Sequence, residues 1–183
     1  VLDGLLILYS HVPSITTFPV YIGRLDMLLD PFITDEEQDY IKIKRFLNHV
    51  DKTVPDSFCH ANIGPYDTKA GRLILKAVIE LEAPTPNMTI RYDKSKTSRE
   101  FAELAAKACL LVSKPSFAND AYYISDLGEQ YGIASCYNAL PECGGAYTLT
   151  RLRLGTIARA CKTVDEMVNE LLPRVAKCAL STM

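Results

Sequence analysis

Strand-like and helix-like segments alternate along most of this 183-residue chain. Short runs rich in β-branched and aromatic residues are typical of strands, and apolar residues repeating every three to four positions are typical of helices. Repeated strand–helix units favour a parallel sheet with helices packed outside it, so we predict an α/β fold. The predicted strands are residues 18–22, 57–63 and 88–90, and the predicted helices between and after them cover about 34–50, 69–81 and 97–113.

The helix starts carry a recurring capping pattern. A threonine followed three residues later by glutamate is a capping box, in which each side chain bonds the other's backbone N–H. This pattern occurs at Thr34, Thr97 and Thr163, and each is predicted to cap the helix that follows. Two helices are expected to close the chain, at about 147–160 and from Thr163 to about residue 179. The apolar stretch at 1–9 is expected to belong to a buried element.

Composition excludes several classes of function. With 48% hydrophobic residues, the chain can bury a sizeable core as one domain. A net charge of −2 gives no reason to expect binding to nucleic acid or to an anionic membrane. No apolar run reaches the length of a transmembrane helix, and the first residues lack the basic flank of a secretory signal.

The six cysteines do not form a recognisable metal or disulfide pattern. No Cys-x-x-Cys pair occurs, so we expect no structural zinc site and no bound metal. A core-rich chain without a secretory signal does not need disulfides. Cys109, Cys161 and Cys178 lie among apolar residues in helical patterns and are expected to be small buried hydrophobic residues.

The segment from Tyr131 to Gly145 is predicted to be an irregular loop with a chemical role. Cys136 follows Ala134 and Ser135, and Pro141 and two glycines come soon after it. Such residues favour a loop rather than a helix or strand. Loops held by a rigid scaffold are common places for catalytic side chains. An ordinary buried thiol remains the alternative for Cys136.

Four segments occur in an order that resembles the glycyl radical enzymes, the superfamily of pyruvate formate-lyase and the radical diol dehydratases. They cover roughly residues 20–145, and within the superfamily they resemble most its YjjI-type branch. Cys136 stands where this family keeps its thiyl-radical cysteine. The segments are Gly23-Arg24-Leu25-Asp26, Pro86-Asn87-Met88-Thr89-Ile90-Arg91, Asn119-Asp120 and Tyr131–Cys136.

The resemblance implies a fold and a size. Glycyl radical enzymes have a ten-stranded α/β barrel built from two half-barrels of parallel strands, with the cysteine loop reaching inside. This chain would supply strands of one half-barrel plus the loop, as a single domain over 1–183. No segment matches the family's glycyl radical motif, so we expect a fragment of a larger enzyme, inactive alone. Its open side would expose apolar surface and favour association, a homo-oligomer included.

The resemblance also implies a mechanism. A glycyl radical, whose glycine is not in this chain, takes hydrogen from Cys136, and the thiyl radical takes hydrogen from a small-molecule substrate. No cofactor would be bound directly. The partner would be a radical S-adenosylmethionine activating enzyme. Because oxygen destroys such radicals, anaerobic use in the cytoplasm is implied.

Departures from the family argue against its two best-known reactions. Pyruvate formate-lyase carries two adjacent cysteines, one of which takes up the acyl group. Ser135 stands at the first of these two positions, and a neutral hydroxyl is a much weaker nucleophile than a thiolate. Asn138 stands where the radical dehydratases carry a glutamate, and an amide cannot accept a proton. Glu142 is a candidate replacement for that base, and the role of Cys143 is open, as are the substrate and the reaction type.

The candidate substrate-binding residues are Arg91, Asn138 and Asp120. Arg91 would recognise an anionic group, with a salt bridge to a helix as the alternative. Asp120 and its neighbour Asn119 would alternatively cap a helix or form a turn. Arg24 and Asp26 would contact substrate or form a structural ion pair.

Two other functions stay open. A catalytically silent α/β scaffold or binding domain would use Cys136 as a structural thiol. A cysteine-nucleophile enzyme would need a histidine beside Cys136, and the histidines of the chain are His11, His49 and His60.

Overall fold

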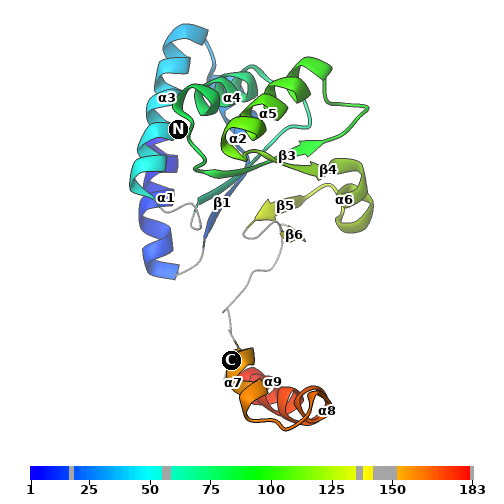
Figure 1. Ribbon diagram of the computed structural model, residues 1–183. Coiled ribbons are helices and arrows are strands. Elements are labelled where there is room, and N and C mark those ends of the chain that lie inside the picture. The colour runs from blue at the N-terminus through cyan, green and yellow to red at the C-terminus, as the bar shows by residue number, and fades with distance from the viewer. Residues whose placement is uncertain (17–18, 55–58, 135–137, 142–151, 182–183) are drawn as a thin grey trace. The chain divides into compact units, whose positions relative to one another are not determined.

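The chain forms two compact units, Val1–Glu142 and Cys143–Met183. The computed structural model (Figure 1) describes residues 1–16, 19–54, 59–134, 138–141 and 152–181. Two groups of residues in contact can still fold together, so the single domain predicted over 1–183 stays a prediction.

Four parallel strands form the sheet of the first unit, in the order β1-β2-β3-β4. The predicted α/β class with a parallel sheet is therefore confirmed. The predicted strands correspond to the first three of these, and β4 was not predicted. The strands are β1 (Val20–Arg24), β2 (Cys59–Ile63), β3 (Asn87–Tyr92) and β4 (Ser116–Asn119).

Helices α3, α4 and α5 connect these strands in sequence. The prediction for α4 matches its observed bounds, and α6 was not predicted. The helices of this unit are α1 (Leu2–Thr16), α2 (Leu25–Leu29) with the short 3-10 turn η1 (Asp30–Phe32), α3 (Glu36–Thr53), α4 (Lys69–Leu81), α5 (Arg99–Val112) and α6 (Asp120–Leu127).

Two of the predicted helix caps were wrong by one residue. The carboxylate of Asp35, not Thr34, accepts the backbone N–H groups of Glu37 and Gln38 at the start of α3. Ser98, not Thr97, caps α5 by accepting the N–H of Phe101. Both neighbours can cap, and the turn that places the side chain over the first helical N–H groups selects one of them.

The two faces of the sheet differ in chemistry. Residues paired in register share a face, and one face carries Ala61, Ile63, Met88 and Ile90. These belong to the same buried cluster as apolar residues of α4 and α5. Figure 1 shows α4 and α5 on this side of the sheet. Each fully buried Ile or Met side chain contributes about 1.5–3 kcal/mol to this packing.

The opposite face is polar. It carries Tyr21 of β1, His60 and Asn62 of β2, and Thr89 and Arg91 of β3. The last four of these side chains are buried. Parallel crossovers are right-handed, so strands added one after another in the same direction carry their connecting helices on one face only. This winding is the one found in α/β barrels. The ten-stranded barrel itself stays a prediction.

A hairpin lies on the polar side of the sheet (Figure 1). Its strands β5 (Tyr131–Ala134) and β6 (Asn138–Pro141) pair antiparallel, with Ile133 opposite Ala139. The prediction of an irregular loop from residue 131 onward was therefore wrong for these two stretches. Residues 135–137, which include Cys136, and residues 142–151 lie outside the described residues.

The second unit contains short helices. The observed α7 is shorter than the helix predicted from about residue 147, whose first residues lie outside the described part. Thr163 caps the next helix by accepting the N–H of Glu166, as predicted. The elements are α7 (Leu154–Arg159), α8 (Val164–Glu166), the π-helical turn η3 (Met167–Leu171) and α9 (Leu172–Ser181).

The three cysteines predicted to be small buried residues are more exposed than expected. Cys109 and Cys161 are half-buried, and Cys178 is exposed. Cys161 lies beyond the end of α7, and α9, which contains Cys178, has no buried residues, so the apolar neighbours of these cysteines overestimated their burial.

Candidate functional site

The candidate site lies where the parallel strands end and the hairpin crosses them. Asn62 and Arg91 are the penultimate residues of β2 and β3, and Asp120 directly follows β4. Carboxyl ends of parallel strands lie at one edge of a sheet, which is where α/β folds place their ligand sites. All three side chains are buried.

Arg91 and Asp120 form a buried ion pair. The Nε of Arg91 donates to Oδ1 of Asp120 over 2.7 Å, and the two side chains are 1% and 0% exposed. Asp120 opens α6 while Asn119 caps it by accepting the N–H of Tyr122. The salt-bridge alternative for Arg91 and the capping alternative for Asn119 are thus both observed.

Tyr131 of β5 completes this cluster. Its hydroxyl donates to Oδ1 of Asp120 over 2.8 Å, and the guanidinium carbon of Arg91 lies 3.9 Å from the centre of its ring. Arg91 also donates to the backbone oxygens of Tyr131 and Glu129, at 3.2 and 3.4 Å. Burial, followed by the hydrogen bond to Asp120, raises the pKa of the Tyr131 hydroxyl, so the phenol stays protonated at neutral pH.

One oxygen of Asp120 has an ionic neighbour but no hydrogen bond. Among the described residues, Oδ2 of Asp120 is buried without a hydrogen-bond donor. The ammonium of Lys96 lies 3.7 Å from it and also pairs with Asp93 at 3.3 Å. Buried carboxylate oxygens ordinarily accept hydrogen bonds, so this oxygen has acceptor capacity left over.

Asn62 forms a second link between sheet and hairpin. Its Nδ2 donates to the backbone oxygen of Ile133 over 2.9 Å, and its Oδ1 accepts the N–H of Ile133 over 2.8 Å. The hydroxyl of Tyr21 donates to the same Oδ1 over 2.9 Å. The ring of Tyr21 also lies against Gly132, where an added Cβ would come within 2.3 Å of it.

The Arg24–Asp26 segment does not form the ion pair that was one of its two predicted roles. Among the described residues, Arg24 contacts the sulfur of Met27, whereas Asp26 accepts from the N–H of Gly64 and the hydroxyl of Thr68. Asp26 is fully buried, and burial raises the pKa of its carboxyl to about 6. Its role is to tie the end of β1 to the turn after β2.

The predicted site residues fall into two groups. Arg91 and Asp120 lie together and contact each other. Asn138 lies in β6, Cys136 lies outside the described residues, and the distances from the histidines to Cys136 are therefore not defined. Substrate contact by Arg91, Asn138 and Asp120 stays a prediction. Asn62 and Tyr21 were missed, although an asparagine near the end of a buried strand was a readable signal.

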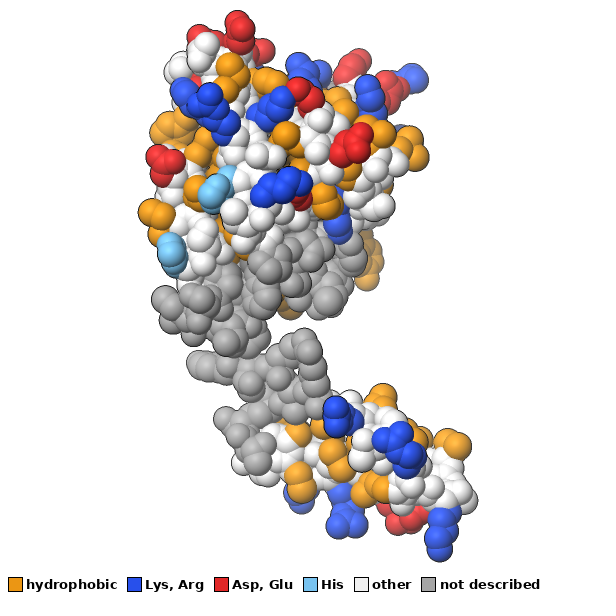
Figure 2. All heavy atoms as spheres, turned by 60° about the vertical axis from the view of Figure 1, so that its left-hand side comes forward, with side chains coloured by type: hydrophobic (Ala, Val, Ile, Leu, Met, Phe, Trp, Pro, Cys, Tyr) orange, Lys and Arg blue, Asp and Glu red, His pale blue; other side chains and the backbone are white. Residues whose placement is uncertain are grey.

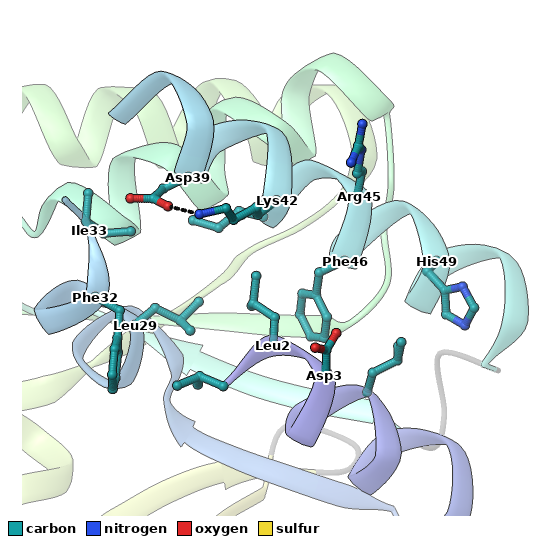
Figure 3. A pocket seen from close by; sticks show the side chains of 13 residues that line it. Leu2, Asp3, Leu29, Phe32, Ile33, Asp39, Lys42, Arg45, Phe46 and His49 are labelled. Atoms are coloured by element: carbon teal, nitrogen blue, oxygen red, sulfur yellow. Dashed lines mark hydrogen bonds and ion pairs between the residues drawn. The ribbon is translucent and has the colours of Figure 1, made fainter. Parts of the chain in front are cut away.

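An open groove lies away from this site. It has a volume of about 550 Å³ and is lined by residues of α1, η1 and α3 (Figure 3). Leu2, Phe32 and Phe46 form its apolar walls, and the Asp39–Lys42 ion pair of 2.8 Å lies at its side. Of the site residues predicted from the sequence, Arg91 and Asp120 do not line it, whereas His49, one of the three histidines considered for a cysteine-nucleophile site, does.

On the face shown in Figure 2, basic and acidic side chains are interspersed over the first unit, in keeping with the net charge of −2. No group of three or more metal-binding side chains occurs among the described residues. In the part of the chain that the structure describes, no helix is long and apolar enough to cross a bilayer.

A family model described as "Glycyl radical enzyme YjjI-like" matches residues 1–183. The chain belongs to the YjjI-like glycyl radical enzyme family. A Haemophilus influenzae relative, named "Uncharacterized protein", is 93% identical over 182 residues, which cover 100% of this chain. "Uncharacterized protein YjjI" of Escherichia coli is 45% identical over 175 residues, 94% of this chain. No solved structure matches.

This YjjI-like chain spans about a third of the length of the curated relatives it matches, 35% and 34%. The fragment status expected from the sequence is therefore confirmed, and so is the family. Membership makes this an enzyme-related protein, in which the Arg91–Asp120 pair and Asn62 hold the hairpin that flanks residues 135–137.

Proposed function

We propose that the chain is the cysteine-bearing part of a glycyl radical enzyme, and that Cys136 is the residue that attacks the substrate. The observation that carries the proposal is the family match over all 183 residues, which includes the segment around Cys136. The hairpin on either side of that cysteine lies over the polar face of the sheet. A cysteine located there would lie close to a substrate bound at the carboxyl ends of the strands.

The proposed chemistry is a relay of one hydrogen atom. The S–H bond of Cys136 breaks, the hydrogen atom joins the glycyl radical supplied from outside this chain, and a thiyl radical remains. A substrate C–H bond then breaks, its hydrogen atom restores the S–H bond, and a substrate radical remains. One unpaired electron is conserved throughout, so no external oxidant is consumed in either step.

The surroundings suit such a relay. A closed site that excludes water and oxidants protects reactive intermediates. On the polar face, Asn62 and the Arg91–Asp120 pair are buried, and most of their polar atoms are bonded internally. We propose a half-barrel of the ten-stranded fold as the enclosure, a radical S-adenosylmethionine activating enzyme as partner, and anaerobic use in the cytoplasm.

The proposed substrate roles of the three candidates follow from the hydrogen-bonding groups that each still has available. Arg91 donates three hydrogen bonds within the protein, so two of its five N–H groups remain for an anionic group of a substrate. Asp120 keeps one buried oxygen without a hydrogen bond and could accept from a substrate hydroxyl. Asn138 would contact a small polar molecule from β6. Acyl transfer through paired cysteines is not proposed, because Ser135 occupies the first of the two cysteine positions.

The test uses the full-length protein after anaerobic activation. Electron paramagnetic resonance should give the doublet of a glycyl radical in the wild type and in Cys136→Ala, because installing the radical needs the glycine and the activating enzyme only. Consumption of small molecules from a defined mixture, followed by mass spectrometry, should be abolished in Cys136→Ala.

Ser135→Ala is the matched control in the same loop and should reduce turnover only mildly. Full activity in Cys136→Ala, or loss of all activity in Ser135→Ala alone, would overturn the assignment of the radical role to Cys136. A serine at position 136 would not substitute, because its O–H bond is much stronger than the S–H bond.

A further inference from the structure

Each of three successive residues of β5 is held by a different part of the sheet. The contacts come from four places along the chain, and all fall within the three residues before Ala134. They are Arg91 and Asp120 on Tyr131, Tyr21 on Gly132, and Asn62 on Ile133. A strand fixed at three of its four residues by three strands of the sheet and the start of α6 has one position and one direction.

Asn62 is the centre of this arrangement. Its carboxamide donates to and accepts from the same residue, Ile133, as the peptide group of a neighbouring strand would. Ile133 stands opposite Ala139 in the hairpin, and the two bonds to Asn62 use the backbone N–H and C=O of Ile133. The side chain thus pairs with a buried backbone N–H and C=O, as a neighbouring strand would.

The residue type at position 62 is specified by this geometry. Asn62 is fully buried, and its oxygen accepts two hydrogen bonds while its nitrogen donates one. Leucine has a similar shape but would leave Ile133 with two unsatisfied backbone groups. Aspartate keeps the acceptor but, when ionised, turns an oxygen toward the carbonyl of Ile133. Neither can replace both halves of the amide at neutral pH.

We infer that Asn62 is a positioning residue for β5, the strand that leads to Cys136, acting through Ile133, three residues before that cysteine in the chain. The inference rests on the proposed function of Cys136. It extends that function by naming the side chain that sets where the loop leaves the sheet. A radical relay requires its atoms to meet at near-contact distance, so a fixed departure point for the loop is a requirement of the chemistry.

The test measures hydrogen–deuterium exchange of the β5 amides in the full-length protein, corrected for the intrinsic rate at each pH. Asn62→Leu should lower the protection of the Ile133 amide about tenfold, the effect of losing one ordinary hydrogen bond. Thr89→Val is the matched control, because Thr89 pairs with Asn62 in register, lies on the same face and is also buried. In the Thr89→Val variant, the β5 amides should exchange as in the wild type.

A third variant separates hydrogen bonding from packing. In Asn62→Asp the carboxylate repels the carbonyl of Ile133 at pH 8, and protection should be low. At pH 5 the protonated acid can donate to that carbonyl, and protection should return toward the wild-type value. At pH 8, iodoacetamide should label Cys136 at least about threefold faster in Asn62→Leu, with labelling of Cys178 unchanged.

Equal β5 exchange in Asn62→Leu and Thr89→Val, or an Asn62→Asp variant equally unprotected at both pH values, would overturn the inference. So would unchanged labelling of Cys136 in Asn62→Leu. None of these measurements needs a radical, so their failure would leave the proposed function standing. Absence of a glycyl radical signal in the activated wild type would instead refute the proposed function and leave the exchange result standing.

Discussion

Replacing Arg91 by methionine should destabilise the first unit more than any surface change. Asp120 is fully buried, and its strongest ionic partner is the guanidinium of Arg91 at 2.7 Å. Removing one member of a buried ion pair costs about 3–5 kcal/mol, because the other charge stays in a low-dielectric site. Lys96, 3.7 Å from the second oxygen of Asp120, compensates in part. We therefore expect the lower end, about 3 kcal/mol.

This loss is large beside the stability of ordinary domains, about 5–15 kcal/mol. The double variant Arg91→Met/Asp120→Asn should recover at least about 1 kcal/mol, since it removes the uncompensated charge. Arg99→Ala is the control, because Arg99 pairs with Glu103 on an exposed helix face, with side chains 87% and 63% exposed. That variant should cost less than about 1 kcal/mol.

The assay is urea-induced unfolding followed by circular dichroism, with the free energy of unfolding compared between variants at pH 7. The β5 hairpin should also lose amide protection in Arg91→Met, since Arg91 donates to the backbone of Tyr131. A change in unfolding free energy no larger than that of Arg99→Ala would refute the argument that this pair is a structural centre of the site.

Three further changes test other parts of the structure. The folded-state pKa of Asp26, about 6, lies above its unfolded value of 3.8, so the folded protein binds the extra proton and wild-type stability should fall as pH rises through 6. By that linkage, thermal unfolding should show Asp26→Asn gaining about 2.5 kcal/mol relative to wild type between pH 4 and pH 8; parallel pH profiles would contradict it. Gly132→Ala places a Cβ within 2.3 Å of the Tyr21 ring and should cost about 1–3 kcal/mol in urea unfolding, whereas a wild-type midpoint would show that the ring moves freely. Asp35→Ala should lower the melting temperature, because it removes a helix cap worth about 1 kcal/mol, and Thr34→Ala should not. A larger effect of Thr34→Ala than of Asp35→Ala would instead support Thr34 as the cap.

The elements that local pattern controls could be predicted from the sequence. Helix α4 was predicted at its observed bounds from its apolar spacing and its end before Pro84, and the structure adds Thr68 as its N-cap. The caps at Asp35 and Ser98 were assigned one residue early, since adjacent residues with the same chemistry compete for one position. Only the backbone turn decides between them.

The hairpin could not be predicted in this way. Tyr131–Ala134 contains glycine and small residues and is followed by proline, which locally favours a loop. Its strand conformation depends on Asn62, 71 positions from Ile133 in the sequence, and on Arg91, 40 positions from Tyr131. Contacts between residues so far apart in the sequence produce no periodic pattern of residue types within the segment itself.

Two residues of the candidate site were selected from the sequence, but their arrangement was not. Arg91 and Asp120 were both selected, with a salt bridge to a helix kept as the alternative for Arg91, and the structure forms that bridge. Asn62 was read only as part of the strand predicted over 57–63, because a polar residue in a strand signals a partner without indicating which group that partner is. The two links to β5 emerge only when the polar face of the sheet is assembled.

The most direct test of the central claim follows the hydrogen atom between the glycyl radical and Cys136 in activated full-length protein transferred to deuterium oxide. A thiol hydrogen exchanges with water, so repeated transfer through Cys136 should replace the α-hydrogen of the glycyl radical by deuterium. The wild-type doublet in electron paramagnetic resonance should then collapse toward a single line, and the Cys136→Ala doublet should persist. Doublets that persist equally in both proteins, or collapse equally in both, would contradict the assignment of the radical relay to Cys136.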